Sequence, residues 1–169
     1  MHGWTLSVSG ETEKGLAQIA GVLERYGAGS VAHVLFTLQS DAHLRVGKPE
    51  ASLVSATSGL KSVKEMGGAP FEAELHRLKG EALLAGAGTA SEAEASIQQG
   101  LAVARRQNAK SWELRCATSL ARLWRQRGRH EDALAMLSPV YNWFTEGFDT
   151  HDLRTARALL DEFAGTTGT

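Results

Sequence analysis

The amino-acid sequence predicts an all-α protein, a right-handed superhelix of stacked helical hairpins that ends in a capping helix. Three observations support this prediction. Alanine and leucine are abundant while there are only three prolines, a composition that favours helix over strand. No segment alternates apolar and polar residues with a period of two, as a half-buried strand would. Small residues also recur at nearly fixed intervals, as expected where helices pack closely.

The recurring unit is a helix, a short glycine-containing turn and a second helix with small residues at fixed offsets. Its last marker falls at Val22, Gly59, Gly100 and Val140, a spacing of about 37 to 41 residues. An ideal tetratricopeptide repeat, which is a pair of antiparallel helices, has about 34 residues. The copy before Gly100 carries its extra length in the loop 85–90, whose glycines and alanines make it flexible by composition.

The repeats divide one domain, residues 1–164, into hairpins. We expect a truncated hairpin at about 1–28, complete hairpins at 30–67, 70–107 and 110–146, a capping helix at 151–164 and a disordered tail at 165–169. Two boundary signals support this division. Pro49 is suited to the first turn of a helix. Ser91 followed by Glu94 forms a capping-box pattern, which predicts the start of a helix that runs to about Gln107.

The charges are unevenly distributed although the net charge is only -1. Between Leu101 and Glu131 the basic residues are Arg105, Arg106, Lys110, Arg115, Arg122, Arg125, Arg127 and Arg129, and the rest of the chain after Glu131 is mostly acidic. This asymmetry indicates contacts between successive helices or a local site for an anionic partner. A nucleic-acid-binding protein would be basic overall, so we expect no direct nucleic-acid partner.

The sequence also bears on where the protein is found. No apolar run approaches the roughly 20 residues that a membrane span needs, and the first residues lack the pattern of a secretion signal. Cys116 is the single cysteine, which excludes an internal disulfide and a zinc site built from cysteines. We therefore expect a cytoplasmic protein that does not associate with membranes.

Several stretches resemble a known family. They are Glu74-Leu-His-Arg-Leu-Lys-Gly-Glu81, Ala104-Arg-Arg-Gln-Asn-Ala-Lys-Ser-Trp-Glu-Leu-Arg115, Ser119-Leu-Ala-Arg-Leu-Trp124, Tyr141-Asn-Trp-Phe-Thr-Glu-Gly-Phe-Asp149 and Ala158-Leu-Leu-Asp161. They resemble the C-terminal tetratricopeptide region of large bacterial multidomain regulators. The resemblance covers nearly the whole chain, most strongly from Phe71 to Glu162. It implies a neighbouring predicted ATPase domain, often preceded by a class III adenylate/guanylate cyclase domain or a DNA-binding domain, and it rests on scaffold residues alone.

In this comparison Met1 falls inside the first helix of a hairpin. A natural solenoid usually begins with a cap, because a bare repeat end exposes apolar surface. We therefore expect this chain to be a fragment or a short relative of a longer regulator, with Trp4, Leu6 and Val8 poorly covered. Such an end would allow homo-oligomers to form, and a strictly monomeric particle in light scattering at high concentration would count against it.

Recognisable catalytic motifs are missing from the sequence. Gly27-Ala-Gly29 and Gly86-Ala-Gly88 lack the Gly-Lys-Ser/Thr of a phosphate-binding loop and do not follow a strand. The six histidines form no His-Glu-x-x-His pattern, and we expect them to be structural. Cys116 has no nearby base that would make it a nucleophile, so a buried filler is expected. We expect no enzymatic activity, cofactor or metal; measurable cyclase or ATPase activity would revive a catalytic hypothesis.

Aromatic residues gather in the last third of the chain. They are Trp112, Trp124, Tyr141, Trp143, Phe144 and Phe148. We favour a core for the last hairpin and the capping helix as their role. The alternative is a partly exposed aromatic surface around Trp143 and Phe148 that docks against another domain.

The remaining candidate site is the concave groove, which the first helix of each hairpin should line. Helical periodicity places these residues there: Thr37, Asp41, Arg45, Glu74, Arg77, Glu81, Arg115, Thr118, Arg122 and Arg125. Arginine forks suit carboxylate and phosphate groups, so an acidic peptide or an anionic effector is a plausible partner. The alternative is a solvated face with ion pairs between helices to Glu81 and Glu113.

Two functional hypotheses follow. The leading one is non-catalytic protein–protein or interdomain recognition, in which the scaffold holds a partner or the neighbouring domains of a larger bacterial signalling regulator. The second is small-molecule sensing, as in transcriptional activators with similar superhelical C-terminal regions. A closed pocket between the groove and the capping helix would favour sensing, whereas an open groove would favour recognition.

Overall fold

The computed structural model describes residues 12–26, 31–86 and 88–166, and within these ranges the chain forms eight α-helices and no strand. The helices are α2 (Thr12–Tyr26), α3 (Ala32–Arg45), α4 (Pro49–Glu65), α5 (Glu72–Ala85), α6 (Ala90–Arg106), α7 (Lys110–Gln126), α8 (His130–Tyr141) and α9 (His151–Thr166). The predicted all-α fold is confirmed. The helix expected near Met1, with Trp4, Leu6 and Val8, lies outside the described residues. Helix α9 includes Gly165 and Thr166, which the sequence analysis assigned to the tail.

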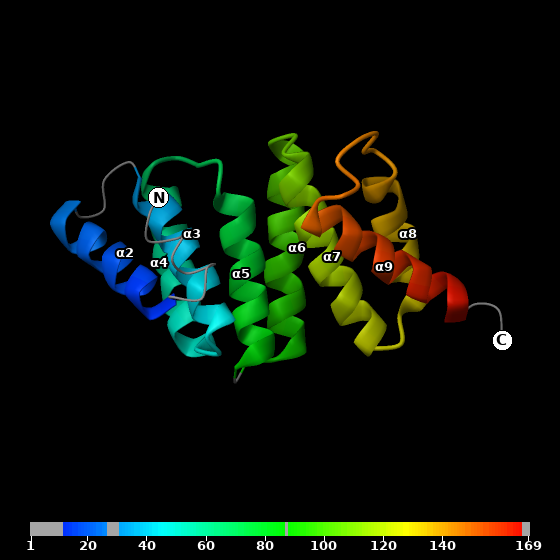
Figure 1. Ribbon diagram of the computed structural model, residues 1–169, viewed down its shortest axis with the longest axis horizontal. Coiled ribbons are helices and arrows are strands. Elements are labelled where there is room, and N and C mark those ends of the chain that lie inside the picture. Colours follow the sequence, from blue (N-terminus) through cyan, green and yellow to red (C-terminus); the bar gives the residue numbers. More distant parts are fainter. Residues whose placement is uncertain (1–11, 27–30, 87, 167–169) are drawn as a thin grey trace.

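The helices pack in hairpins that follow one another along the long axis of the molecule (Figure 1). Helix α3 pairs with α4, α5 with α6, and α7 with α8, while α9 packs on both α7 and α8. The first helices also contact one another, α3 with α5, α5 with α7 and α7 with α9. In the described part of the chain, α4, α6 and α8 make no such contacts with each other. The first helices therefore form the inner face of the curved stack.

Helix α9 closes the largest apolar cluster of the described chain. It buries Leu153, Ala156, Leu159 and Phe163 against residues of α6, α7 and α8 that include Ile97, Leu114, Leu120, Leu137 and Val140. The buried residues of α9 recur at three- and four-residue intervals, so they lie on one face of the helix. Its other face is polar and exposed. One apolar and one polar face are what a capping helix requires, because the stack ends there.

Three glycines explain the regular spacing of small residues. A Cβ atom added to Gly80 would lie 2.4 Å from Ile97 Cγ1, and one added to Gly100 would lie 2.7 Å from the carbonyl oxygen of Ala73. A Cβ atom on Gly59 would lie 2.6 Å from Leu75 Cδ2. These separations are too short for two non-bonded heavy atoms. Of the repeat markers, Gly59 and Gly100 are thus positions at which one helix meets the next with no room for a side chain, whereas Val22 is 38% exposed and is not such a position.

Two turns between paired helices share one geometry. Gly47 follows α3 with φ +68° and Gly128 follows α7 with φ +73°, in the left-handed region that suits glycine. The amide of Lys48 donates to the carbonyl of His43, and the amide of Arg129 donates to that of Trp124, both at 2.9 Å. These are the bonds of a Schellman motif, which satisfies the last carbonyls of a helix.

The expected capping box at Ser91 and Glu94 is wrong by two residues. Helix α6 begins instead with Thr89, whose side chain accepts from the amide of Glu92 at 3.2 Å, while the Thr89 amide donates to the Glu92 carboxylate at 2.9 Å. The sequence contains both patterns, and tertiary contacts select one of them. The carboxylate of Glu94 accepts a hydrogen bond from Trp124 Nε1 at 2.6 Å and therefore holds α6 against α7. The expectation for Pro49 is confirmed, because it stands in the first turn of α4.

Partial burial of His76 on α5 predicts a loss of stability in acid. Burial, with a smaller contribution from Lys79, lowers the pKa of His76 to about 4. The unfolded chain therefore binds a proton more readily than the folded one, so stability falls as the pH falls from about 6.5 towards 4. Because the ring is partly exposed, we expect this residue to account for only about 1–2 kcal/mol of that loss.

Urea denaturation at about pH 7 and about pH 4.5 tests this prediction. The difference in unfolding free energy between the two pH values should be smaller in His76→Gln than in the unchanged protein. An identical pH dependence in the two proteins would contradict the assignment.

Candidate functional site

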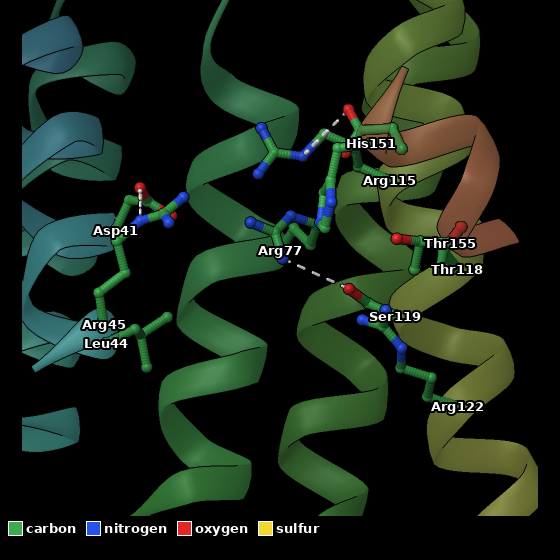
Figure 2. Close-up of a pocket in the computed structure, with 11 residues that line it drawn as sticks. Asp41, Leu44, Arg45, Arg77, Arg115, Thr118, Ser119, Arg122, His151 and Thr155 are labelled. Atoms are coloured by element: carbon green, nitrogen blue, oxygen red, sulfur yellow. Dashed lines mark hydrogen bonds and ion pairs between the residues drawn. The ribbon is translucent and has the colours of Figure 1, made fainter. Parts of the chain in front are cut away.

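The inner face of the stack holds a pocket of about 340 Å³ between the first helices α3, α5 and α7 and the capping helix α9 (Figure 2). Its walls are formed by Asp41, Leu44 and Arg45 of α3, Arg77 of α5, Arg115, Thr118, Ser119 and Arg122 of α7, and His151, Asp152 and Thr155 of α9. Each first helix contributes because its inner face points into the curve of the stack. Four arginines surround a space large enough for one small polar group or a short stretch of peptide.

Most of the residues expected in the groove line this pocket. They are Asp41, Arg45, Arg77, Arg115, Thr118 and Arg122. The other four lie elsewhere. Thr37 is buried and donates a hydrogen bond to the carbonyl oxygen of His33 at 2.7 Å. Glu74 and Glu81 belong to the ion network behind the pocket wall, and Arg125 forms an ion pair with Glu162 of α9.

The network is centred on a buried pair within α5. Arg77 Nε and Nη2 each donate to one oxygen of the Glu74 carboxylate at 2.8 Å, which is the bidentate geometry of a strong pair. The Glu74 side chain is only 2% exposed and that of Arg77 10%. Burial opposes the positive charge of Arg77, but the carboxylates of Glu74 and Glu81 outweigh it and raise the pKa of Arg77. The guanidinium therefore stays charged beside the pocket.

A second set of bonds joins α5 to α7. Ser119 Oγ donates to Glu81 Oε1 at 2.5 Å, and the same carboxylate oxygen lies 3.5 Å from Arg77 Nη1. Arg77 Nη1 also donates to Ser119 Oγ at 3.4 Å, a bond drawn in Figure 2. Sequence periodicity did not single out Ser119, because it assigned the preceding residue, Thr118, to the inner face of this helix. It fixes the position of one helix against the next at the pocket floor.

Arg115 connects three helices at the pocket wall. Its Nη1 atom lies 2.9 Å from Glu74 Oε1 on α5, and its Nε atom lies 3.9 Å from Asp152 Oδ2 on α9. The guanidinium also lies over the ring of Trp112, with its central carbon 5.4 Å from the ring centroid. The shorter distance shows that Glu74 is the stronger partner. Arg115 therefore has only part of its charge and hydrogen-bonding capacity available to a ligand.

Arg122 is the pocket arginine that lacks an internal partner. Within the part of the chain that the structure describes, its exposed side chain makes no hydrogen bond or ion pair, whereas Arg45 is held by Asp41 at 2.8 Å. Figure 2 shows Arg122 beside Ser119 on the inner side of α7. An arginine in a recess with its donors unused is a natural site for a carboxylate or a phosphate.

The contribution of α9 to the pocket could not be read from the sequence. His151, Asp152 and Thr155 stand in the first turns of α9, and they reach the pocket because that helix crosses α7. Their spacing resembles that of any amphipathic helix start. The expected structural role of the histidines applies to His33, which is buried, while His151 is exposed at the pocket.

The alternative for the groove was a solvated face with ion pairs between helices to Glu81 and Glu113, and both carboxylates do form ion pairs. Glu81 pairs with Arg77 of its own helix, while Glu113 binds Arg105 at 3.0 Å and Lys110 at 2.7 Å. Neither carboxylate neutralises Arg122. The solvated-face hypothesis thus accounts for most of the charged residues around the groove but leaves that arginine without a partner.

Other expected sites can be placed directly. Cys116 is fully buried, and burial raises the pKa of its thiol to about 12, so it is an inert filler.

The described residues contain no cluster of three or more histidine, cysteine or acidic side chains that could hold a metal ion. No helix of the described chain has both the length and the apolar character needed to cross a bilayer.

The aromatic residues of the last third divide into three groups. Trp112 packs against a separate small cluster of Ala73, Val103 and Ala104. Trp124 is buried in the large apolar cluster, and Tyr141 and Phe144 pack against it, as expected. Trp143 and Phe148 are 57% and 47% exposed, so the expectation that they belong to the core is wrong. Both lie in the connection between α8 and α9, as does Phe144, which packs against the apolar cluster.

Comparison with known proteins supports the fold. No known family model and no curated protein sequence matches this chain. The fold is similar to the crystal structure of MamA, a tetratricopeptide-like helical protein, with a TM-score of 0.61 over 98% of this chain and 94% of that one. The two sequences are 14% identical, so the likeness establishes a shared architecture only. The chain is a tetratricopeptide-like helical repeat protein in its fold.

Proposed function

We propose that this protein is a non-catalytic scaffold that binds an acidic peptide segment of a protein partner on its inner face. The observation that carries the proposal is the position of Arg122, whose guanidinium has no partner among the described residues and lies in a pocket built from four helices. The buried ion network behind it fixes the surrounding side chains before any ligand arrives. Such preorganisation lowers the entropic cost of binding.

The lining of the pocket favours a peptide over a drug-like molecule. Small-molecule sites are mostly apolar and occupy about 300–1,000 Å³. This pocket, of about 340 Å³, stands at the lower end of that range, and Leu44 is its single aliphatic side chain. A peptide would instead place one carboxylate at Arg122 and extend along the inner faces of the neighbouring helices.

Sensing of a small anionic effector is the second candidate, and one observation favours it. Residues of the capping helix form one wall of the pocket, so a ligand there would contact both α7 and α9. Titration calorimetry with free glutamate and with a peptide that carries one glutamate separates the two candidates. Equal affinities would favour the effector, whereas a much tighter peptide would favour recognition.

We further propose that the scaffold acts in a cytoplasmic bacterial signalling or transcriptional regulator. The support is the resemblance of the stretches 74–81, 104–115, 119–124 and 141–149 to the C-terminal repeats of such regulators. Its partners would then include neighbouring domains, an ATPase and in some cases a cyclase. Self-association through the first hairpin is the additional oligomeric hypothesis, and light scattering over a range of concentrations tests it.

The peptide-binding proposal predicts the effect of Arg122→Ala. Loss of a charge-assisted hydrogen bond should weaken binding of a fluorescently labelled peptide that carries one glutamate by about tenfold or more, as measured by fluorescence anisotropy. Arg122 is the cleanest substitution, because Arg115 and Arg125 also form ion pairs within the protein.

Arg154→Ala is the matched control for Arg122→Ala. Arg154 is an exposed arginine of α9 that does not line the pocket, and its removal changes the net charge by the same amount. It should leave the affinity nearly unchanged. Equal affinities for the unchanged protein and Arg122→Ala would exclude the pocket as the binding site.

A further inference from the structure

The capping helix places a carboxylate in the pocket that the proposed function does not use. Asp152 lines the pocket from the first turn of α9, and its side chain is 44% exposed. Helix α9 is fixed in place by Leu153, Ala156, Leu159 and Phe163, which are buried in the apolar cluster. The backbone at Asp152 is therefore held by packing, and its carboxylate remains at the pocket whether or not a ligand is present.

Asp152 contributes little to holding the protein together. Its Oδ2 atom lies 3.9 Å from Arg115 Nε, which is too far for a hydrogen bond, and both side chains are partly exposed. Arg115 already has a closer partner in the buried Glu74, at 2.9 Å. The remaining effect of Asp152 is electrostatic. It places a negative charge next to Arg115, whose hydrogen-bond donors a second anionic group of a ligand would reach.

The charges of the pocket therefore differ from one wall to the other. No carboxylate of the described chain forms an ion pair with Arg122, whereas Asp41 is engaged with Arg45 of the same helix, α3, and Asp152 lies beside Arg115. A ligand with one carboxylate gains the attraction of Arg122. A ligand with a second negative charge close to the first would meet Asp152 and be repelled.

We propose that Asp152 is a specificity-determining residue that restricts the pocket to segments presenting a single carboxylate. This inference rests on the proposed function, because it concerns the ligand of the same pocket. Asp152 occupies the place of a second ligand carboxylate beside Arg115, so polyanionic segments are disfavoured although the pocket contains four arginines. Discrimination of this kind uses a repulsive group in addition to an attractive one.

Asp152→Asn and two labelled peptides test the proposal. One peptide carries two adjacent glutamates. The other has the same sequence except that glutamine replaces the second glutamate, so it carries a single glutamate. The unchanged protein should bind the peptide with two glutamates more weakly than the peptide with one. Asp152→Asn should bind the peptide with two glutamates about three- to tenfold more tightly than the unchanged protein does. Its gain in affinity for the peptide with one glutamate should be smaller.

Two further variants assign the effect to this carboxylate. Asp161→Asn removes the same charge from an exposed position of α9 that does not line the pocket, and it should leave the preference unchanged. Asp152→Glu should retain the behaviour of the unchanged protein. Thermal melting checks that each variant is folded, and the gain of affinity should disappear when Arg122→Ala is added to Asp152→Asn.

The outcomes separate this inference from the proposed function. If no protein of the set binds either peptide, both are wrong. If the unchanged protein binds in a manner that depends on Arg122 but Asp152→Asn shows no new preference, the inference about Asp152 is wrong and the proposed function stands. An equal gain in Asp161→Asn would show a long-range effect of net charge and would also overturn the inference.

Discussion

Replacing Glu74 by glutamine is expected to lower the free energy of unfolding by about 3–5 kcal/mol. Glu74 accepts both hydrogen bonds of the Arg77 fork and also pairs with Arg115. The amide of glutamine has almost the same size but no charge, so the Arg77 guanidinium would remain buried with only Glu81 to compensate it. A buried charge that loses its closest partner is much more costly than the loss of an exposed pair.

Urea denaturation followed by circular dichroism measures this effect. Asp161→Asn is the matched control, since it breaks a pair with Arg157 in which both side chains are more than half exposed. The control should change stability by less than about 0.5 kcal/mol. Replacing both Glu74 and Arg77 by methionine should recover part of the stability lost in Glu74→Gln, because no buried charge then remains at either position. A loss below about 1 kcal/mol in Glu74→Gln would show that water reaches the pair.

Gly100→Val is expected to destabilise the protein by about 3 kcal/mol. A Cβ atom at this position would lie 2.7 Å from the backbone carbonyl oxygen of Ala73, and the next atoms are His76 Cβ at 3.1 Å and Cys116 Sγ at 3.2 Å. A backbone carbonyl cannot rotate away as a side chain can, so α5 and α6 would have to separate. The two helices form one hairpin, and their separation would disturb both neighbouring hairpins.

Gly21→Val provides the comparison. Gly21 lies in α2, and no atom of residues 12–26, 31–86 or 88–166 lies within 4 Å of an added Cβ atom there. The change should stay within about 0.5 kcal/mol and can be favourable, because valine forms helix slightly better than glycine. Thermal unfolding of the two variants measures the difference. Equal effects at Gly100 and Gly21 would contradict the close-packing explanation of the repeat.

The fold could be predicted because its signal is local and repeated. Gly59 and Gly100 are small because a neighbouring helix leaves no room for a side chain at either position, so their spacing reports the hairpin period. The start of α6 could not be predicted to the residue. Thr89 and Ser91 each stand three residues before a glutamate, and the choice between them depends on Trp124, which lies far away in the sequence.

The candidate site could be predicted only in part, because it too depends on contacts between residues far apart in the sequence. Helical periodicity places Arg115, Arg122 and Arg125 on one side of α7, but it cannot tell which of them is neutralised. That depends on where α5 and α9 place their carboxylates, which is a tertiary property: Glu74 reaches Arg115 and Glu162 reaches Arg125. Arg122 is the one of the three that no described residue pairs with, and this difference cannot be read from the sequence.

The central claim is that a partner binds in the pocket around Arg122 on the inner face. Chemical-shift mapping by NMR, with a ¹⁵N-labelled protein titrated with a peptide carrying one glutamate, tests it most directly. We expect the shifted amides to cluster in α3, α5, α7 and the first turns of α9, and the shifts to vanish in Arg122→Ala. Shifts confined to α4, α6 and α8, or shifts that persist unchanged in Arg122→Ala, would contradict the account.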